Sequence, residues 1–129
     1  MPDIEILAVL VATAVAFAVG GAYYAVSGDA LATASGSPAD QEMPRWALAV
    51  ELGRCLLIAL VVAGLASQGE IDGVAGGLAL GLALWVGFPL VLLVGAVVHE
   101  NTPWRAAAIH AGDWLLKLLA VGVLVSVMQ

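Results

Sequence analysis

Five ionisable side chains lie within long apolar stretches of the sequence, where charged groups are rare. They are Glu51, Arg54, His110, Asp113 and Lys117. Ionisable residues inside a membrane form proton, ion or substrate paths, or they pair with one another and fix which helices pack together. Histidine is the side chain that most often shuttles protons, so His110 could serve that role, or it could be a hydrogen-bonded packing residue.

The composition indicates an integral membrane protein. The chain has 129 residues, of which 63% are hydrophobic and 11% charged, and its mean hydropathy is +1.07. A soluble domain carries about 25% charged residues, and a chain this short could not bury so much apolar surface. Ten acidic residues against four basic ones argue against a nucleic-acid partner. The single cysteine, Cys55, excludes an internal disulfide.

Four apolar segments are each long enough to cross a bilayer core of about 30 Å as a helix. They span about residues 4–26, 44–67, 73–98 and 103–128. No alternation of apolar and polar residues is present, which argues against a β-barrel. We therefore expect an all-α fold, a bundle of four transmembrane helices in one domain covering residues 1–129. Pro89 predicts a kink in the third helix. We expect residues 27–43 to form a polar loop, in which residues 37–40 could start a short interfacial helix.

The loops indicate the orientation. Their basic residues are Arg45 and Arg105, which flank two loops on the same side. By the positive-inside rule these loops face the cytoplasm and both termini face outward. The sequence therefore predicts a multi-pass protein of the cytoplasmic membrane, surrounded by the lipid bilayer.

The second and fourth segments resemble one another. When residues 44–67 are aligned with 103–126, ten positions are identical. Either the chain is two helical hairpins in a parallel internal repeat, or helices rich in Ala, Leu and Val resemble one another by composition. The alignment places Arg54 opposite Asp113 and Glu51 opposite His110, at matching depths.

The energetics favour pairing of these charges. A charged residue at the centre of a span costs about 2.5–3.5 kcal/mol, and the fourth segment carries two, Asp113 and Lys117. We expect both to face the bundle, with an interhelical Arg54–Asp113 ion pair and Glu51 near His110 or Lys117.

Small residues at every fourth position form three seams along which helices can approach closely. The seams are Ala8–Gly20, Cys55–Ala63 and Gly73–Gly81. They could mediate packing within one chain, between copies in a homo-oligomer, or against a larger membrane complex.

Motifs for catalysis are absent from the sequence. We find no nucleophile motif, no phosphate-binding loop and no paired catalytic carboxylates, so we expect neither enzymatic activity nor a cofactor. His99 and His110 lack the spacing of metal ligands, so no metal site is expected.

Several short motifs resemble the bacterial membrane proteins of the domain of unknown function 1761 family. They are residues 20–24 (GGAYY), residues 81–88 (GLALWVGF), Glu100, and residues 109–112 (IHAG). The family pattern more often has Asn at position 110 and an aromatic residue at 113, so His110 and Asp113 are departures, as are the other three charges of the network. The resemblance implies a four-helix inner-membrane protein with no established activity.

These observations favour a small integral membrane protein of unassigned biochemical function that self-associates and contains a structural intramembrane charge network. One alternative is a proton- or cation-coupled small-molecule transporter acting as an oligomer, in which Glu51 or Asp113 would bind the proton. The other is an accessory subunit of a larger membrane complex.

Overall fold

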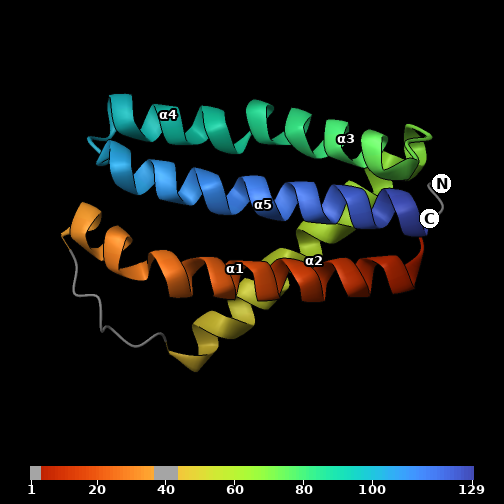
Figure 1. Ribbon diagram of the computed structural model, residues 1–129, viewed down its shortest axis with the longest axis horizontal. Helices are drawn as coiled ribbons and strands as arrows, with labels where there is room; N and C mark the ends of the chain where they lie inside the picture. Colours follow the sequence, from red (N-terminus) through yellow and green to blue (C-terminus); the bar gives the residue numbers. More distant parts are fainter. Residues whose placement is uncertain (1–3, 37–43) are drawn as a thin grey trace.

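The computed structural model describes residues 4–36 and 44–129, and in that part of the chain every regular element is helical. Five helices follow one another along the sequence (Figure 1). They are α1 (Ile6–Ser35), α2 (Arg45–Gln68), α3 (Gly73–Gly87), α4 (Pro89–His99) and α5 (Trp104–Met128). The predicted all-α fold is confirmed.

Four spans are long and apolar enough to cross a membrane, because α3 and α4 together make one of them, Gly73–His99. α2 and α5 start at the same end of the molecule and run in the same direction, as expected (Figure 1). The start of α1 and the end of α5 meet at the other end, where the backbone N–H of Glu5 donates a hydrogen bond of 3.1 Å to Gln129 Oε1.

The break between α3 and α4 confirms the kink predicted at Pro89. Proline has no N–H to donate, so the helical hydrogen bond to the carbonyl of Trp85 is lost. Phe88 lies at the break with φ −124° and ψ −77°. Its N–H still bonds to Leu84, and its carbonyl accepts from Leu92, each at 3.0 Å. The two helical segments therefore continue one another with a local bend.

The first helix is longer than expected, so the prediction of a loop beginning at residue 27 is wrong. α1 continues to Ser35 and ends at Gly36, which has a left-handed backbone with φ 72°. The hydroxyls of Ser27 and Thr33 each donate a hydrogen bond to a backbone carbonyl one turn earlier, at 2.7 and 2.9 Å. These polar side chains therefore do not interrupt the helix. The interfacial helix expected at residues 37–40 lies outside the described residues.

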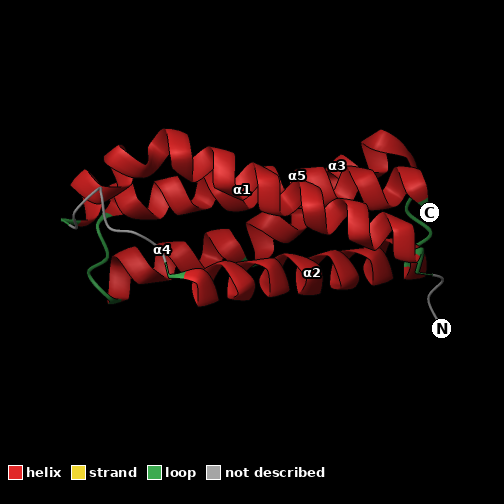
Figure 2. Cartoon of the chain, turned by 90° about the horizontal axis from the view of Figure 1, so that it is seen from below, coloured by secondary structure: helices red, strands yellow, loops and turns green. Residues whose placement is uncertain are grey.

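The bundle is organised around α5, which contacts each of the other four helices. α1, α3, α4 and α5 run nearly parallel in projection, and α2 crosses them obliquely (Figure 1). Figure 2 shows α2 along one side of the bundle, where it packs against α1 and α5. This arrangement leaves α5 to supply the residues that touch several neighbours at once.

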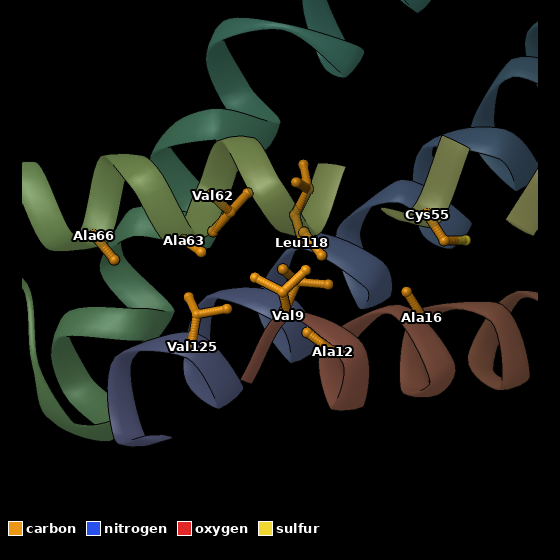
Figure 3. Packing of buried hydrophobic residues seen from close by; sticks show 11 residues of the cluster. Val9, Ala12, Ala16, Cys55, Val62, Ala63, Ala66, Leu118 and Val125 are labelled. Carbon is orange, nitrogen blue, oxygen red and sulfur yellow. The ribbon is translucent and has the colours of Figure 1, made fainter. Parts of the chain in front are cut away.

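Small side chains make the close packing possible. Ala12 and Ala16 of α1 and Ala63 of α2 are buried where these helices meet Leu118 and Val125 of α5 (Figure 3). All the small residues of the α1 and α2 seams are buried within the chain, and they are Ala8, Ala12, Ala16, Gly20, Cys55, Ala59 and Ala63.

The glycine seam of α3 packs against α5 in the same way. A Cβ added at Gly77 would lie 2.5 Å from the carbonyl oxygen of Gly122, and one at Gly81 would lie 2.5 Å from that of Leu118. The two backbones are therefore in direct contact. The three seams are used largely inside one chain, so a surface for self-association or docking has to be sought elsewhere.

Candidate functional site

Four of the five candidate residues form a continuous cluster of ion pairs between α2 and α5. Lys117 Nζ lies 2.8 Å from Glu51 Oε1 and 3.0 Å from Asp113 Oδ2. Arg54 Nη1 lies 2.8 Å from Glu51 Oε2. The order Arg54, Glu51, Lys117, Asp113 alternates in sign, so the formal charges cancel. We call these four residues the charge cluster.

The pairing within the charge cluster differs from the expected one. Among the residues the structure describes, Arg54 pairs with Glu51 and not with Asp113. Arg54 and Glu51 lie one turn apart on α2, and Lys117 and Asp113 lie one turn apart on α5, so each acid finds a base on its own helix. The helices are joined by Lys117, whose contact with Glu51 is one of the two alternatives expected for Glu51 and is confirmed.

Burial increases along the charge cluster from the surface to the interior. The side chain of Arg54 is 53% exposed and that of Glu51 is 28% exposed. The side chains of Lys117 and Asp113 are only 5% and 4% exposed. Charges this deeply buried require partners, and Lys117 meets the requirement with two carboxylates, one from each helix.

Gly20 of α1 makes room for the buried end of the charge cluster. A Cβ at this position would lie 2.7 Å from Lys117 Cε and 2.9 Å from its Nζ, and 3.5 Å from Asp113 Oδ1. Any side chain here would displace the lysine. Gly20 therefore belongs to the site. The sequence signalled this glycine by its place at the end of a small-residue seam and in the motif of residues 20–24.

One carboxylate oxygen of the charge cluster is left over. Asp113 Oδ1 is buried and has no hydrogen-bond partner among the described residues, whereas Oδ2 is paired with Lys117. Buried polar atoms of this kind are uncommon in proteins. A free acceptor next to a paired lysine could take a proton or a small cation.

Trp114 packs beside both bases of the charge cluster. The guanidinium carbon of Arg54 lies 5.5 Å from the centre of the indole ring, and Lys117 Nζ lies 5.6 Å from it. Both distances allow a cation–π interaction. The indole thus adds a second contact that holds Arg54 of α2 against α5.

His110 makes a separate contact, one turn before Asp113. Its Nδ1 lies 2.7 Å from the hydroxyl of Tyr24, and the neighbouring hydroxyl of Tyr23 donates to the carbonyl of Ile109 at 2.6 Å. Both bonds join α1 to α5. Among the described residues His110 has no ion pair, so the structure places it in a tyrosine–histidine contact beside the charge cluster.

The described residues contain no group of three or more His, Cys, Asp or Glu side chains arranged to hold a metal ion. The fold and site thus define a small helical bundle with four spans and a neutral charge cluster that is buried at its α5 end. The family model described as "Protein of unknown function (DUF1761)" matches residues 7–126, so the chain belongs to that family. The resemblance found in its motifs is thereby confirmed. Comparisons with curated proteins and with solved structures gave no match.

Proposed function

We propose that this chain is a self-associating integral protein of the cytoplasmic membrane, with its termini outside, in which the charge cluster has a structural and not a catalytic role. The observation that carries this proposal is the position of Lys117 between Glu51 of α2 and Asp113 of α5. One ammonium group pairs with two carboxylates, and it is itself almost completely buried. Such a contact sets the register and rotation of α2 on α5.

The pairing also makes the fourth span compatible with a membrane. Unpaired, Asp113 and Lys117 would each cost about 2.5–3.5 kcal/mol at the centre of a helix. Paired and turned toward the bundle, they face neither lipid nor water. Removal of one partner of a buried pair typically costs about 3–5 kcal/mol, because it leaves an uncompensated charge, whereas removal of both can be nearly neutral.

The test is a comparison of Lys117→Met with the double variant Lys117→Met, Asp113→Asn. Glu51 keeps Arg54 as its partner in both. We expect the single variant to lose about 3–5 kcal/mol of unfolding free energy, measured by circular dichroism during titration with a denaturing detergent, and the double variant to recover most of that loss. Arg45→Gln, at an exposed position, is the control and should change little. A double variant as unstable as the single one would contradict the proposal.

Self-association is supported by the outer face of α2. Arg54 lies about 14 Å along the helix from Arg45, close to the middle of the span, and its side chain is 53% exposed in a single copy. Leu57 and Val61, one and two turns further on, are 62% and 54% exposed. A second copy placed on this face would shield Arg54 from the acyl chains. We therefore propose the α2 face around Arg54 as the contact between copies.

Proton- or cation-coupled transport is the second candidate, and Asp113 Oδ1 favours it. This oxygen is buried and unpartnered among the described residues, and the adjacent lysine connects it to the more exposed Glu51. Protonation of Asp113 would release Lys117 to pair with Glu51 alone. Such an exchange of partners could couple a proton to a change in helix packing.

Transport is tested with proteoliposomes that contain a pH-sensitive dye and are placed in a pH gradient. If transport is the function, the wild-type chain moves protons and Asp113→Asn abolishes the flux while the protein remains folded by circular dichroism. Asp72→Asn, at an exposed position outside the spans, should leave the flux unchanged. Equal dye signals from wild-type, Asp113→Asn and protein-free liposomes would exclude coupled proton movement.

A further inference from the structure

A groove opens between the last turns of α1 and the first turns of α5, at the end of the molecule opposite Ile6 and Met128. It has a volume of about 480 Å³ and is lined from α1 by Asp29 and Thr33 and from α5 by Trp104 and Arg105. The remaining lining residues are alanines and one isoleucine. The groove is separate from the charge cluster, and none of its residues takes part in the structural role proposed above.

The two charged residues of the groove, Asp29 and Arg105, have opposite signs. No ion pair is formed by either of them, with the other or with a third group, within the described part of the chain. Both are exposed. The guanidinium of Arg105 lies 5.4 Å from the ring centre of Trp104, on the α5 side of the groove. A ligand that carries a positive and a negative charge a few atoms apart would match both sides.

The level of the groove along α1 and α5 indicates what kind of ligand it can meet. α1 has 30 residues, about 45 Å, whereas a bilayer core is about 30 Å thick, so the end of α1 extends past the acyl chains. The contact between Tyr24 and His110 sets the antiparallel register. Asp29 lies five residues after Tyr24 and Arg105 five residues before His110, which puts both at the same level, among the lipid headgroups.

We propose that this groove binds the headgroup of a zwitterionic phospholipid with a primary amine, phosphatidylethanolamine. Arg105 pairs with the phosphate, and Asp29 accepts hydrogen bonds from the ammonium. The hydroxyl of Thr33 donates its own proton to the carbonyl of Asp29 at 2.9 Å, so its free lone pairs are oriented to accept from the same ammonium. The indole of Trp104 covers the glycerol region, as tryptophans do at membrane interfaces.

This arrangement discriminates among headgroups. A choline headgroup has the same two charges but no N–H, so it cannot donate to Asp29 or Thr33. A glycerol headgroup lacks the cation and leaves Asp29 beside a second negative charge. Hydrogen bonds that involve a charged group contribute enough to shift affinity by about tenfold. The groove should therefore bind phosphatidylethanolamine about tenfold more tightly than phosphatidylcholine. Phosphatidylglycerol should bind no better than phosphatidylcholine.

The experiment uses the full chain in detergent. Native mass spectrometry measures apparent dissociation constants for phosphatidylethanolamine, phosphatidylcholine and phosphatidylglycerol with identical acyl chains. We expect about tenfold tighter binding of phosphatidylethanolamine than of phosphatidylcholine. Asp29→Asn and, independently, Thr33→Val should reduce this preference, and Arg105→Gln should weaken all three lipids. The matched controls, Asp72→Asn and Arg45→Gln, are also exposed and lie outside the groove, and they should retain the preference. Circular dichroism checks the fold of each variant.

Two results would overturn the proposal. The first is equal affinity for the three lipids, or a preference for ethanolamine that persists in both Asp29→Asn and Thr33→Val. The second is competition by water-soluble glycerophosphoethanolamine at the same concentration as the lipid, because the groove would then recognise a soluble ligand and not a membrane component. Failure of either kind leaves the charge cluster and its structural role untouched, since no residue is shared.

Discussion

Lys117 Nζ and Glu51 Oε1 lie 2.8 Å apart and form, among the described residues, the ion pair that joins two different helices. The lysine comes from α5, in the centre of the bundle, and the glutamate from the obliquely placed α2. Every other ion pair of the charge cluster is formed within one helix. The stability of α2 on α5 should therefore depend on this contact more than on any single apolar pair.

The space at Gly20 should be essential only because Lys117 occupies it. Gly20→Ala is expected to lower the unfolding free energy by about 1–3 kcal/mol, since the added methyl would displace the ammonium from its two carboxylates. Thermal unfolding followed by circular dichroism measures the change. Gly21→Ala is the matched control, because nothing lies within 4 Å of a Cβ there, and it should be neutral or slightly stabilising. A loss that persists in a Lys117→Ala background, in which the atoms nearest the added methyl are removed, would show that the lysine is not the cause.

The contact between the backbones of α3 and α5 should be equally intolerant of a side chain. We expect Gly77→Ala to cost about 1–3 kcal/mol or more, because the methyl would meet the carbonyl of Gly122 and the Cα of Val123, which cannot rotate away. The denaturing-detergent titration measures this loss. Gly95→Ala in α4 has open space around it and serves as the control. Similar stabilities for the two variants would contradict the helix contact described above.

The exposed guanidinium of Arg54 should matter for association between copies. Arg54→Gln removes one ion pair with Glu51 and the charge that we propose a second copy covers, so the dimer should dissociate at a concentration about tenfold higher, as a loss of about 1.4 kcal/mol implies. Fluorescence energy transfer between labelled copies in liposomes measures the change. Arg45→Gln, at the exposed start of α2, is the control. Unchanged energy transfer in Arg54→Gln would remove the α2 face from the proposed interface.

The spans could be predicted from the sequence because they depend on length and composition alone. The break before Pro89 could be predicted as well, since a missing N–H has the same effect in any helix. The end of α1 differs from the prediction because small polar residues such as Ser27 and Thr33 are typical of loops, whereas here their hydroxyls bond to the helix's own carbonyls. Composition alone does not distinguish these two uses of a small polar side chain.

The membership of the charge cluster was predictable, but its pairing was not. Matching depth was enough to bring Glu51, Arg54, Asp113 and Lys117 together. The partner of each depends on the rotation of α2 about its axis, which the sequence specifies only through packing. That rotation leaves Arg54 at the surface beside Trp114 and puts Glu51 within reach of Lys117. His110 lies at the same level but bonds to Tyr24, which the sequence marked as part of the motif of residues 20–24 without indicating its partner.

The coupling free energy between Glu51 and Lys117 tests the structural role of the charge cluster most directly. It is obtained from the unfolding free energies of the wild-type chain, Glu51→Gln, Lys117→Gln and the double variant, all measured in the same detergent titration. We predict a coupling of about 0.5–3 kcal/mol, the range for residues that share one ion-pair network. A coupling below about 0.5 kcal/mol, the scatter of independent sites, would mean that the two side chains do not stabilise one another and would contradict the account.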